Sequence, residues 1–145
     1  MLYLDTSALL KLYVREAGSE WVQQEIESQD EPLPLWEIQE MELHNALMLK
    51  VFRGELSEED ATRQIDLLRG RKVKGLYYVP EIRRAQLMGD FRKLSALTSE
   101  LGCRTMDILH VACALQLKPS RFISFDNRQL GLAHKAGLSV STTEE

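Results

Sequence analysis

Four acidic side chains stand in or directly beside apolar stretches of this sequence. They are Asp5, Glu42, Asp107 and Asp126. Asp5 and Asp126 each follow a short apolar run, while Asp107 interrupts one and Glu42 begins one. A carboxylate at the end of a buried strand must be paired, protonated or bound to a cation. Several such acids in one small chain therefore suggest a metal site.

The chemistry of such a site follows from its ligands. Carboxylate oxygens suit hard cations such as Mg²⁺ and Mn²⁺. Carboxylates held close together repel one another, and one of them protonates unless a cation lies between them. Two bound cations roughly 4 Å apart can stabilise both the attacking and the leaving oxygen of an in-line displacement at phosphorus. This chemistry needs no cysteine or histidine nucleophile, and the sequence shows no sign of one.

Each acid also has a structural interpretation that the residues alone leave open. Asp5 and Asp126 can each cap the helix that follows them. Asp107 can cap the first turn of its own helix, although the residues after it are very apolar for an exposed helix end. A glutamate on a helix usually faces solvent, and Glu37 and Glu40 lie close to Glu42. The pattern therefore does not choose among these three glutamates.

Length and composition limit the class of protein. A chain of 145 residues predicts one domain with a single sizeable core. The formal net charge of −4 neither indicates nor excludes a nucleic-acid partner, because local fields matter more than the sum. No apolar run approaches the roughly 20 residues of a membrane span, and the first residues do not resemble a signal peptide. Cys103 and Cys113 are expected to be packing groups in a reduced cytoplasm.

Short apolar strands alternate with helices along the chain. The expected strands cover residues 1–4, 76–79, 121–125 and 138–140, and residues 32–35, with two prolines, are either a connection or a brief edge strand. Helices are expected in the intervening segments, including long ones at about 81–100 and 105–117. This alternation predicts a parallel sheet covered on both faces. Ligands of such sheets bind outside the carboxyl ends of the strands. Asp5 and Asp126 both follow a strand, so neighbouring strands would place them on one rim.

Four segments resemble the motifs of a known family. Residues 5–13, 42–47, 104–112 and 124–130 are similar, in this order, to the motifs of PIN-domain ribonucleases. The similarity is greatest to the VapC-type toxins of toxin–antitoxin pairs. Two departures stand out: Ser124 replaces the more usual threonine, and Trp36 and Glu37 replace small hydroxyl residues before the second motif.

The resemblance implies a fold, an activity and a set of site residues. The fold would be a three-layer α/β/α PIN-like domain over residues 1–145, with a central parallel sheet of about four to five strands. The activity would be that of an endoribonuclease that depends on Mg²⁺ or Mn²⁺. The implied metal-binding acids are Asp5, Glu42, Asp107 and Asp126, and Thr6 and Ser124 would orient a carboxylate or the attacking water.

The resemblance also implies partners. These are an RNA substrate, a cognate antitoxin protein and a second copy of the chain in a homodimer, without a membrane. An apolar patch for dimer contact is expected around Tyr13, Trp21 and residues 32–36. The basic run of Arg71, Lys72 and Lys74 is either a solvated loop or a phosphate clamp, and Arg104 is the expected contact at the pocket edge.

Three other functions remain open on the sequence. A PIN-type nuclease can process RNA without a toxin role, and a non-catalytic binding module can keep the fold, although all four acidic positions are filled. Phosphoaspartyl chemistry is disfavoured, because a phosphatase of that kind expects a second aspartate where Ser7 stands. His110 lies one helical turn after Asp107 and is expected to be a packed, structural histidine rather than a ligand.

Overall fold

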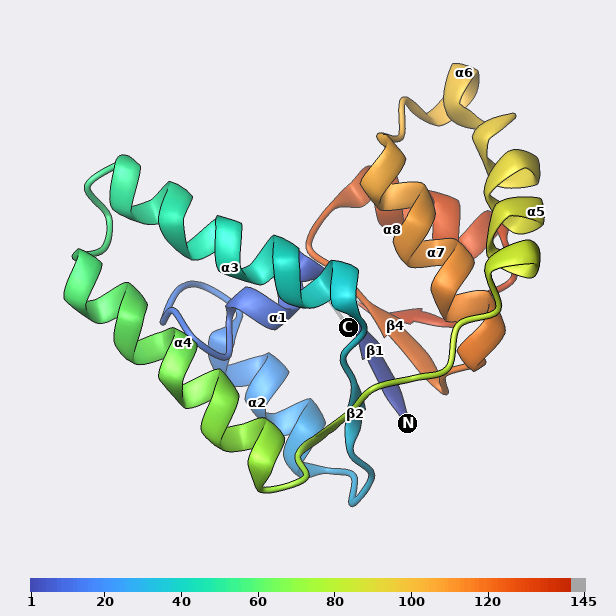
Figure 1. Ribbon diagram of the computed structural model, residues 1–145. Helices are drawn as coiled ribbons and strands as arrows, with labels where there is room; N and C mark the ends of the chain where they lie inside the picture. The colour runs from blue at the N-terminus through green and yellow to red at the C-terminus, as the bar shows by residue number, and fades with distance from the viewer. Residues whose placement is uncertain (142–145) are drawn as a thin grey trace. The chain divides into compact units, whose positions relative to one another are not determined.

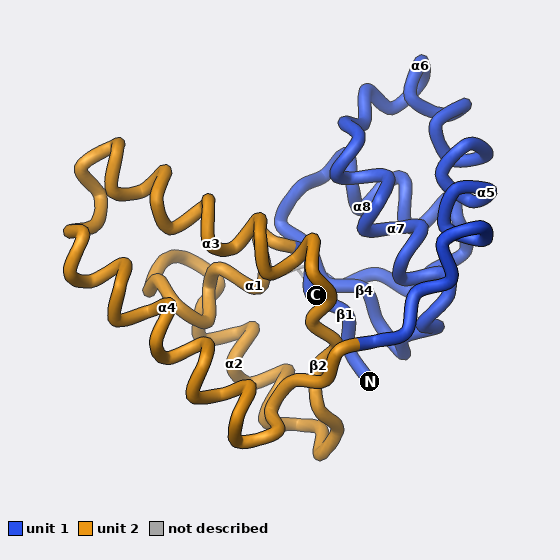
Figure 2. The backbone as a smooth tube through the Cα atoms, viewed as in Figure 1, with its two compact units in different colours: residues 1–5, 80–145 blue, residues 6–79 orange. Residues whose placement is uncertain are grey.

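The computed structural model describes residues 1–141, which form two compact units (Figure 2). Unit 1 contains residues 1–5 and the chain from residue 80 onward, and unit 2 contains residues 6–79. Each unit has its own helices and its own pair or set of parallel strands (Figure 1). Within residues 1–141, no helix combines the length and the apolar character that crossing a bilayer requires.

Unit 1 is built on a three-stranded parallel sheet. Its strands are β1 (Leu2–Leu4), β4 (Arg121–Ile123) and β5 (Val140–Ser141), in the order β1-β4-β5. Tyr3 lies opposite Phe122, which in turn lies opposite Val140. Parallel neighbours need a crossover connection, usually helical. The helices between them are α5 (Arg84–Ser95), α6 (Thr98–Leu101), α7 (Thr105–Leu117) and α8 (Asn127–Lys135).

An aromatic and histidine cluster fills the core of unit 1. Tyr3 is fully buried, and its ring stacks on Phe122 with 5.3 Å between the centroids. The Tyr3 hydroxyl and Nδ1 of buried His110 form a hydrogen bond of 2.9 Å. Burial raises the pKa of the neighbouring Cys113 thiol to about 12, although a hydrogen bond with Tyr3 acts in the opposite direction. The predictions of a packed His110 and of Cys113 as a packing group are both confirmed.

Unit 2 is mainly helical. Its helices are α1 (Thr6–Leu10), α2 (Ser19–Glu27), α3 (Glu37–Phe52) and α4 (Glu58–Val73). The long α3 packs on α1 and α4 and buries Leu43 and Leu47. Helix α4 begins after Ser57, whose hydroxyl accepts a hydrogen bond from the Asp60 backbone N–H. Two short parallel strands, β2 (Leu33–Pro34) and β3 (Tyr77–Tyr78), complete the unit.

The predicted class of fold is confirmed, and the strand arrangement is more divided than expected. The chain is an α/β protein with parallel strands, but the five strands form one sheet of three and one of two. The strands of the smaller sheet, β2 and β3, have only two residues each. Leu33 and Leu35 donate their N–H groups to β3 and its flanking residue, and Pro34 between them has no N–H to offer a further strand on the other side of β2. The prediction of one central sheet of four to five strands therefore gives way to two sheets. The prediction of a single domain over residues 1–145 stays a prediction.

The long helix expected at about 81–100 is interrupted and begins later. Helix α5 covers Arg84–Ser95, and α6 follows as a separate short helix. The segment before α5 is extended because the Gln116 side chain of α7 binds the backbone of Arg83 at both polar groups. Its Oε1 accepts from the Arg83 N–H at 3.0 Å, and its Nε2 donates to the Arg83 carbonyl at 3.2 Å.

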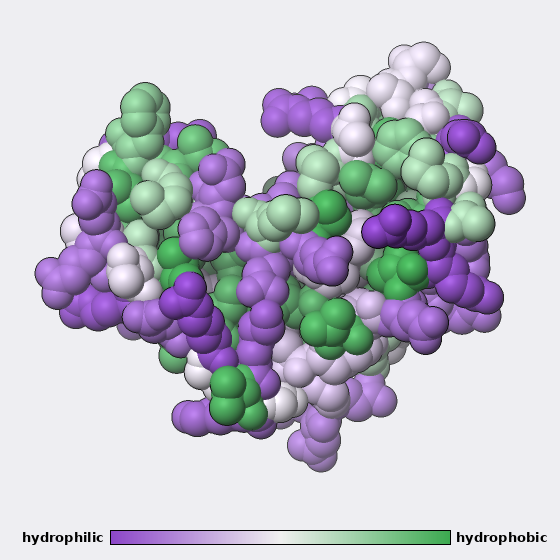
Figure 3. All heavy atoms as spheres, in the orientation of Figure 1, coloured by the Kyte–Doolittle hydropathy of each residue, from purple (hydrophilic) through white to green (hydrophobic). Residues whose placement is uncertain are grey.

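The apolar surface of unit 2 differs from the expected patch. Tyr13 and Trp36 are buried, whereas Met41, Met48 and Phe52 of α3 are exposed. Figure 3 shows apolar atoms among polar ones on the face in view, over the part of the molecule where α3 lies. The expectation for Tyr13 and Trp36 was wrong, because both side chains pack inward.

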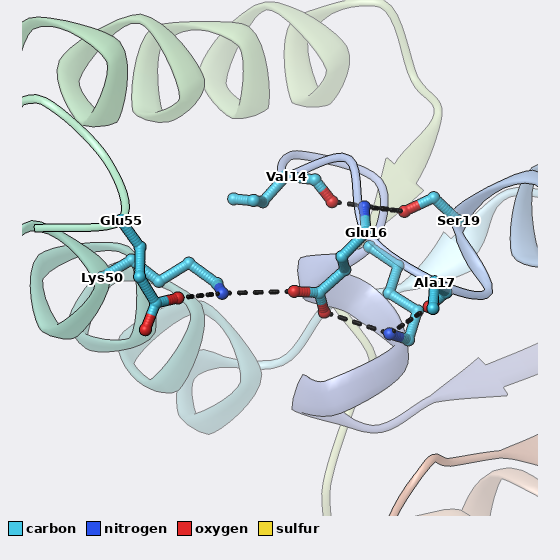
Figure 4. Close-up of polar contacts among 7 residues, drawn as sticks. Val14, Glu16, Ala17, Ser19, Lys50 and Glu55 are labelled. Carbon is cyan, nitrogen blue, oxygen red and sulfur yellow. Dashed lines mark hydrogen bonds and ion pairs between the residues drawn. The ribbon is translucent and has the colours of Figure 1, made fainter. Parts of the chain in front are cut away.

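Two lysines share one glutamate in unit 2 (Figure 4). Lys11 Nζ donates to Glu16 Oε1 at 3.0 Å, and Lys50 Nζ lies 3.2 Å from Glu16 Oε2 and 2.9 Å from Glu55 Oε2. The lysine side chains are only 9% and 13% exposed. Burial acts to raise the pKa of Glu16, but the hydrogen bonds and charges of the two lysines outweigh it, so that this pKa lies below 4.5.

This network predicts a pH-dependent contribution to stability. Because the pKa of Glu16 is lowered in the folded state, its carboxylate stabilises the fold above the ordinary pKa, and this contribution disappears as the pH falls through the folded-state pKa. We expect Glu16→Gln to be less stable than wild type at about pH 7, with a difference that shrinks towards about pH 3. Urea unfolding of both proteins across this range measures it. Glu20→Gln is the control, since Glu20 pairs with Arg15 only at the surface. A difference that stays constant with pH would contradict the prediction.

Candidate active site

Asp5 and Ser124 meet at the carboxyl ends of β1 and β4. The Asp5 N–H donates to the Ile123 carbonyl at 3.0 Å, which continues the pairing of the two strands by one residue. Asp5 is 3% exposed, and its Oδ2 accepts a hydrogen bond of 2.6 Å from the buried Ser124 hydroxyl. Hydrogen bonds to an ionised carboxylate are short and strong. The sheet therefore brings together two of the residues that the sequence singles out, on the expected rim.

Asp126 follows Ser124 and caps α8. Its Oδ1 accepts from the N–H groups of Arg128 at 2.8 Å and Gln129 at 3.3 Å. Its own N–H donates to Ser124 Oγ at 3.0 Å. The capping interpretation of Asp126 is thus correct, and it occupies only one carboxylate oxygen. Within residues 1–141, Oδ2 accepts no hydrogen bond.

Asp107 is the third residue of α7 and caps the first turn of that helix. Its Oδ2 accepts a hydrogen bond of 2.7 Å from the Arg104 N–H. Ile108 and the residues from His110 to Ala114 are buried, whereas Asp107 in the first turn is half-buried. As with Asp126, capping uses one oxygen, and Oδ1 of Asp107 accepts no hydrogen bond from the described residues.

The negative charges of Asp107 and Asp126 both act on the buried thiol of Cys103 in unit 1. Burial raises the pKa of Cys103, and the negative charges of both aspartates raise it further, while Arg128 acts against them. Cys103 Sγ lies 3.6 Å from the Arg128 carbonyl oxygen. Both carboxylates are therefore close enough to act on one thiol, which packs inside unit 1 as the sequence predicts.

Sequence reasoning missed Gln129. This side chain is 2% exposed, and its amide contacts both Ser124 and the Asp107 carbonyl. A sequence signal was present, because position 129 lies one helical turn before Ala133, on the packed face of α8. A polar residue on the packed face of a helix requires partners.

Glu42 and Thr6 form a separate contact within unit 2. The Thr6 hydroxyl donates to Glu42 Oε2 at 2.6 Å, where α1 packs against α3. The two glutamates close to Glu42 in the sequence have other surroundings: Glu40 pairs with Lys72 at 2.7 Å, and Glu37 is exposed. The structure thus places Asp5, Asp107 and Asp126 in unit 1 and Glu42 in unit 2.

The basic residues divide into two groups. Arg71 lies over the Tyr13 ring, 4.9 Å from its centroid, and donates to the Leu12 carbonyl at 3.2 Å. Lys72 binds both carboxylate oxygens of Glu40. Arg71 and Lys72 are therefore engaged within unit 2, whereas the side chains of Lys74 and Arg104 are exposed.

The oxygen atoms of the candidate acidic and hydroxyl side chains are suitable ligands for Mg²⁺ or Mn²⁺. Carboxylate and hydroxyl oxygens are the ligands that hard cations prefer, and two of the aspartates keep an oxygen that no hydrogen bond occupies among residues 1–141. In the described part of the chain, however, no group of three or more His, Cys, Asp or Glu side chains is arranged to hold a metal ion. The donors fit, and their side chains are not gathered around one point.

Comparison with solved structures shows the same fold in several proteins. FitAcB from Neisseria gonorrhoeae is 17% identical with a TM-score of 0.66, over 98% of this chain and 97% of that one. VapBC-1 from nontypeable Haemophilus influenzae is 18% identical with a TM-score of 0.67, over 97% of each chain. Mycobacterium tuberculosis VapC20, a toxin that cleaves the sarcin–ricin loop, is 13% identical with a TM-score of 0.68, over 95% and 96%.

Comparison at the level of sequence assigns the family. A search of curated proteins gave no significant match. The model of the PIN domain matches residues 2–135, which is most of the chain and includes all four segments singled out by the sequence. This chain belongs to the PIN-domain family.

Proposed function

We propose that this protein is an endoribonuclease that depends on Mg²⁺ or Mn²⁺ and acts as the toxin of a toxin–antitoxin pair. The observation that carries the proposal is the hydrogen bond between Asp5 and Ser124 at the carboxyl ends of β1 and β4. Ser124 also accepts from the Asp126 N–H, and Gln129 contacts both Ser124 and the Asp107 carbonyl. Membership of the PIN-domain family supports it. VapC20, which shares the fold, is an RNA-cleaving toxin.

The residues of the chain have distinct roles in this proposal. A bound cation would supply an activated water and neutralise charge on the phosphate. Ser124 holds the Asp5 carboxylate, while the caps of α7 and α8 fix the backbone that carries Asp107 and Asp126. We include Glu42 as the fourth acid on the strength of the family motif, with Thr6 orienting its carboxylate.

RNA, an antitoxin and a second copy of the chain are the proposed partners. Arg104 and Lys74 are exposed and able to contact phosphates, whereas contacts from Arg71 and Lys72 would have to compete with their present partners. The antitoxin partner is supported by the shared fold with VapBC-1 and FitAcB.

The test is cleavage of total RNA by the purified protein, with Mg²⁺, with Mn²⁺ and with a chelator. We expect cleavage only when a cation is present, because the carboxylates alone cannot neutralise the charge of the phosphate. The fragments should carry 5′-phosphate and 3′-hydroxyl ends. Absence of cleavage across varied RNA pools with either cation would contradict the proposal and favour a non-catalytic binding module. Growth arrest on expression would separate a toxin from a nuclease of RNA processing.

A further inference from the structure

Gln129 contacts Ser124, Asp107 and Asp126, and Ser124 in turn binds Asp5. Its Oε1 lies 3.0 Å from the Ser124 hydroxyl, at the end of β4. Its Nε2 donates to the Asp107 carbonyl in the first turn of α7, through a longer contact of 3.4 Å. Its backbone N–H donates to Asp126 Oδ1. No charge is involved in the side-chain contacts, and the amide is almost fully buried.

The hydroxyl of Ser124 has one hydrogen to donate, and two acceptor oxygens lie within hydrogen-bond distance of it. It faces Asp5 Oδ2 at 2.6 Å and Gln129 Oε1 at 3.0 Å, while its oxygen accepts from the Asp126 N–H. The shorter bond, to the carboxylate, is the stronger one. Gln129 therefore offers a second acceptor. If the Asp5 carboxylate turns away to bind a ligand, the Ser124 hydroxyl can turn to Gln129 and is not left unpaired in the interior.

We propose that Gln129 is a positioning residue of the nuclease site. Its amide lies against the Ser124 hydroxyl and donates to the Asp107 carbonyl in the first turn of α7, and so fixes Ser124, which binds Asp5, relative to Asp107. Its backbone N–H ties Asp126 to the same residue. This inference rests on the proposed function, since it assigns Gln129 to the same site. It does not require Gln129 to touch RNA or a cation.

The main test replaces Gln129 by methionine, which has nearly the same length and neither amide group. We expect Gln129→Met to lower the kcat of RNA cleavage about 10- to 100-fold, as is typical when an outer partner of a metal ligand is lost, with little change in KM. Mn²⁺ binding to the RNA-free protein should weaken by a similar factor.

The matched control is Gln116→Met. Gln116 also makes two amide hydrogen bonds to backbone, but at the other end of α7 and to Arg83. Because these bonds lie in the same unit and contact none of the aspartates, we expect kcat and Mn²⁺ binding to stay at the wild-type level. Thermal unfolding of both variants shows whether they are folded.

A second variant keeps the inference testable if Gln129→Met does not fold. Ser124→Ala removes the hydroxyl through which Gln129 reaches Asp5, so it should shift the side-chain amide NMR signals of Gln129 and leave those of Gln116 unchanged. If the double variant Ser124→Ala/Gln129→Met folds, it should lose no more activity than the more impaired single variant. The reason is that Gln129 reaches Asp5 only through Ser124, so either change removes the same connection.

The outcomes separate this inference from the proposed function. Cleavage by wild type together with equal kcat and Mn²⁺ binding for Gln129→Met and Gln116→Met would overturn the positioning role. Unmoved Gln129 amide signals in Ser124→Ala would also overturn it. If wild type cleaves no RNA, the proposed function fails, and Mn²⁺ binding and the amide signals still decide whether Gln129 organises the carboxylates.

Discussion

Asp107→Asn is expected to abolish RNA cleavage while the protein stays folded. The structural role of Asp107 is to accept a hydrogen bond from the Arg104 N–H, and the Oδ1 of asparagine can accept the same bond. What asparagine lacks is the negative charge that a cation site requires. The loss should exceed the roughly 10- to 100-fold expected for an outer partner of a metal ligand. Asp5→Asn should behave in the same way, with the Ser124 contact preserved.

The measurement compares cleavage rates in Mg²⁺ for wild type, Asp107→Asn and a control, with circular dichroism and thermal unfolding as checks on folding. Asp66→Asn is the control, because Asp66 is an exposed acid on α4 whose ion pair with Arg69 lies at the surface. It should cleave like wild type. If Asp107→Asn cuts RNA at the wild-type rate, the assignment of this carboxylate to the site is wrong.

Phe122→Ala is expected to cause the largest loss of stability of any change considered for this protein. Phe122 lies on β4, the middle strand of the sheet in unit 1, has no exposed surface and stacks on Tyr3. Its truncation removes buried apolar surface and leaves a cavity, at a cost of about 3–5 kcal/mol. Since Ser124 follows this strand by one residue, the site should be disordered as well.

Urea unfolding of Phe122→Ala and Phe52→Ala measures the effect. Phe52 is 87% exposed at the end of α3, so its truncation should change the free energy of unfolding by less than about 0.5 kcal/mol. Both substitutions remove the same phenyl group, and the two positions differ in how far that group is buried. Equal losses in the two variants would contradict the placement of Phe122 in the core.

The sequence was most informative where local pattern determines structure. Apolar runs followed by Asp5 and by Asp126 predicted two strand ends on one rim. Ser124, which lies two residues before Asp126, binds the Asp5 carboxylate, in agreement with that prediction. The apolar character of residues 105–117 predicted a central helix, and α7 is largely buried. Glu42 is different: Glu37 and Glu40 lie close to it on the same helix, and only the family motif preferred Glu42. The Thr6 contact that distinguishes Glu42 is a tertiary one.

The features that were missed depend on partners distant in sequence. Gln116 prevents an early start of α5 by binding the backbone of Arg83, and no local propensity of residues 81–84 indicates this. Likewise, Lys72 looked like part of a free basic run until Glu40 was placed beside it. Periodicity shows which face of an element is apolar, but it does not show which polar side chain on another element will reach it.

The pairing of β1 with β4 has a consequence for the order of events during synthesis. Unit 2 is one continuous segment, whereas β1 lies at the very start of the chain, and Asp5 and Ser124 are 119 residues apart. A growing chain therefore carries Leu2–Leu4 without its partner strand until Arg121–Ile123 has been added. The pair of Asp5 and Ser124 cannot exist on a nascent chain that is shorter than this. A protein proposed to cut RNA would thus lack the contact between Asp5 and Ser124 until both strands of this pair have been synthesised.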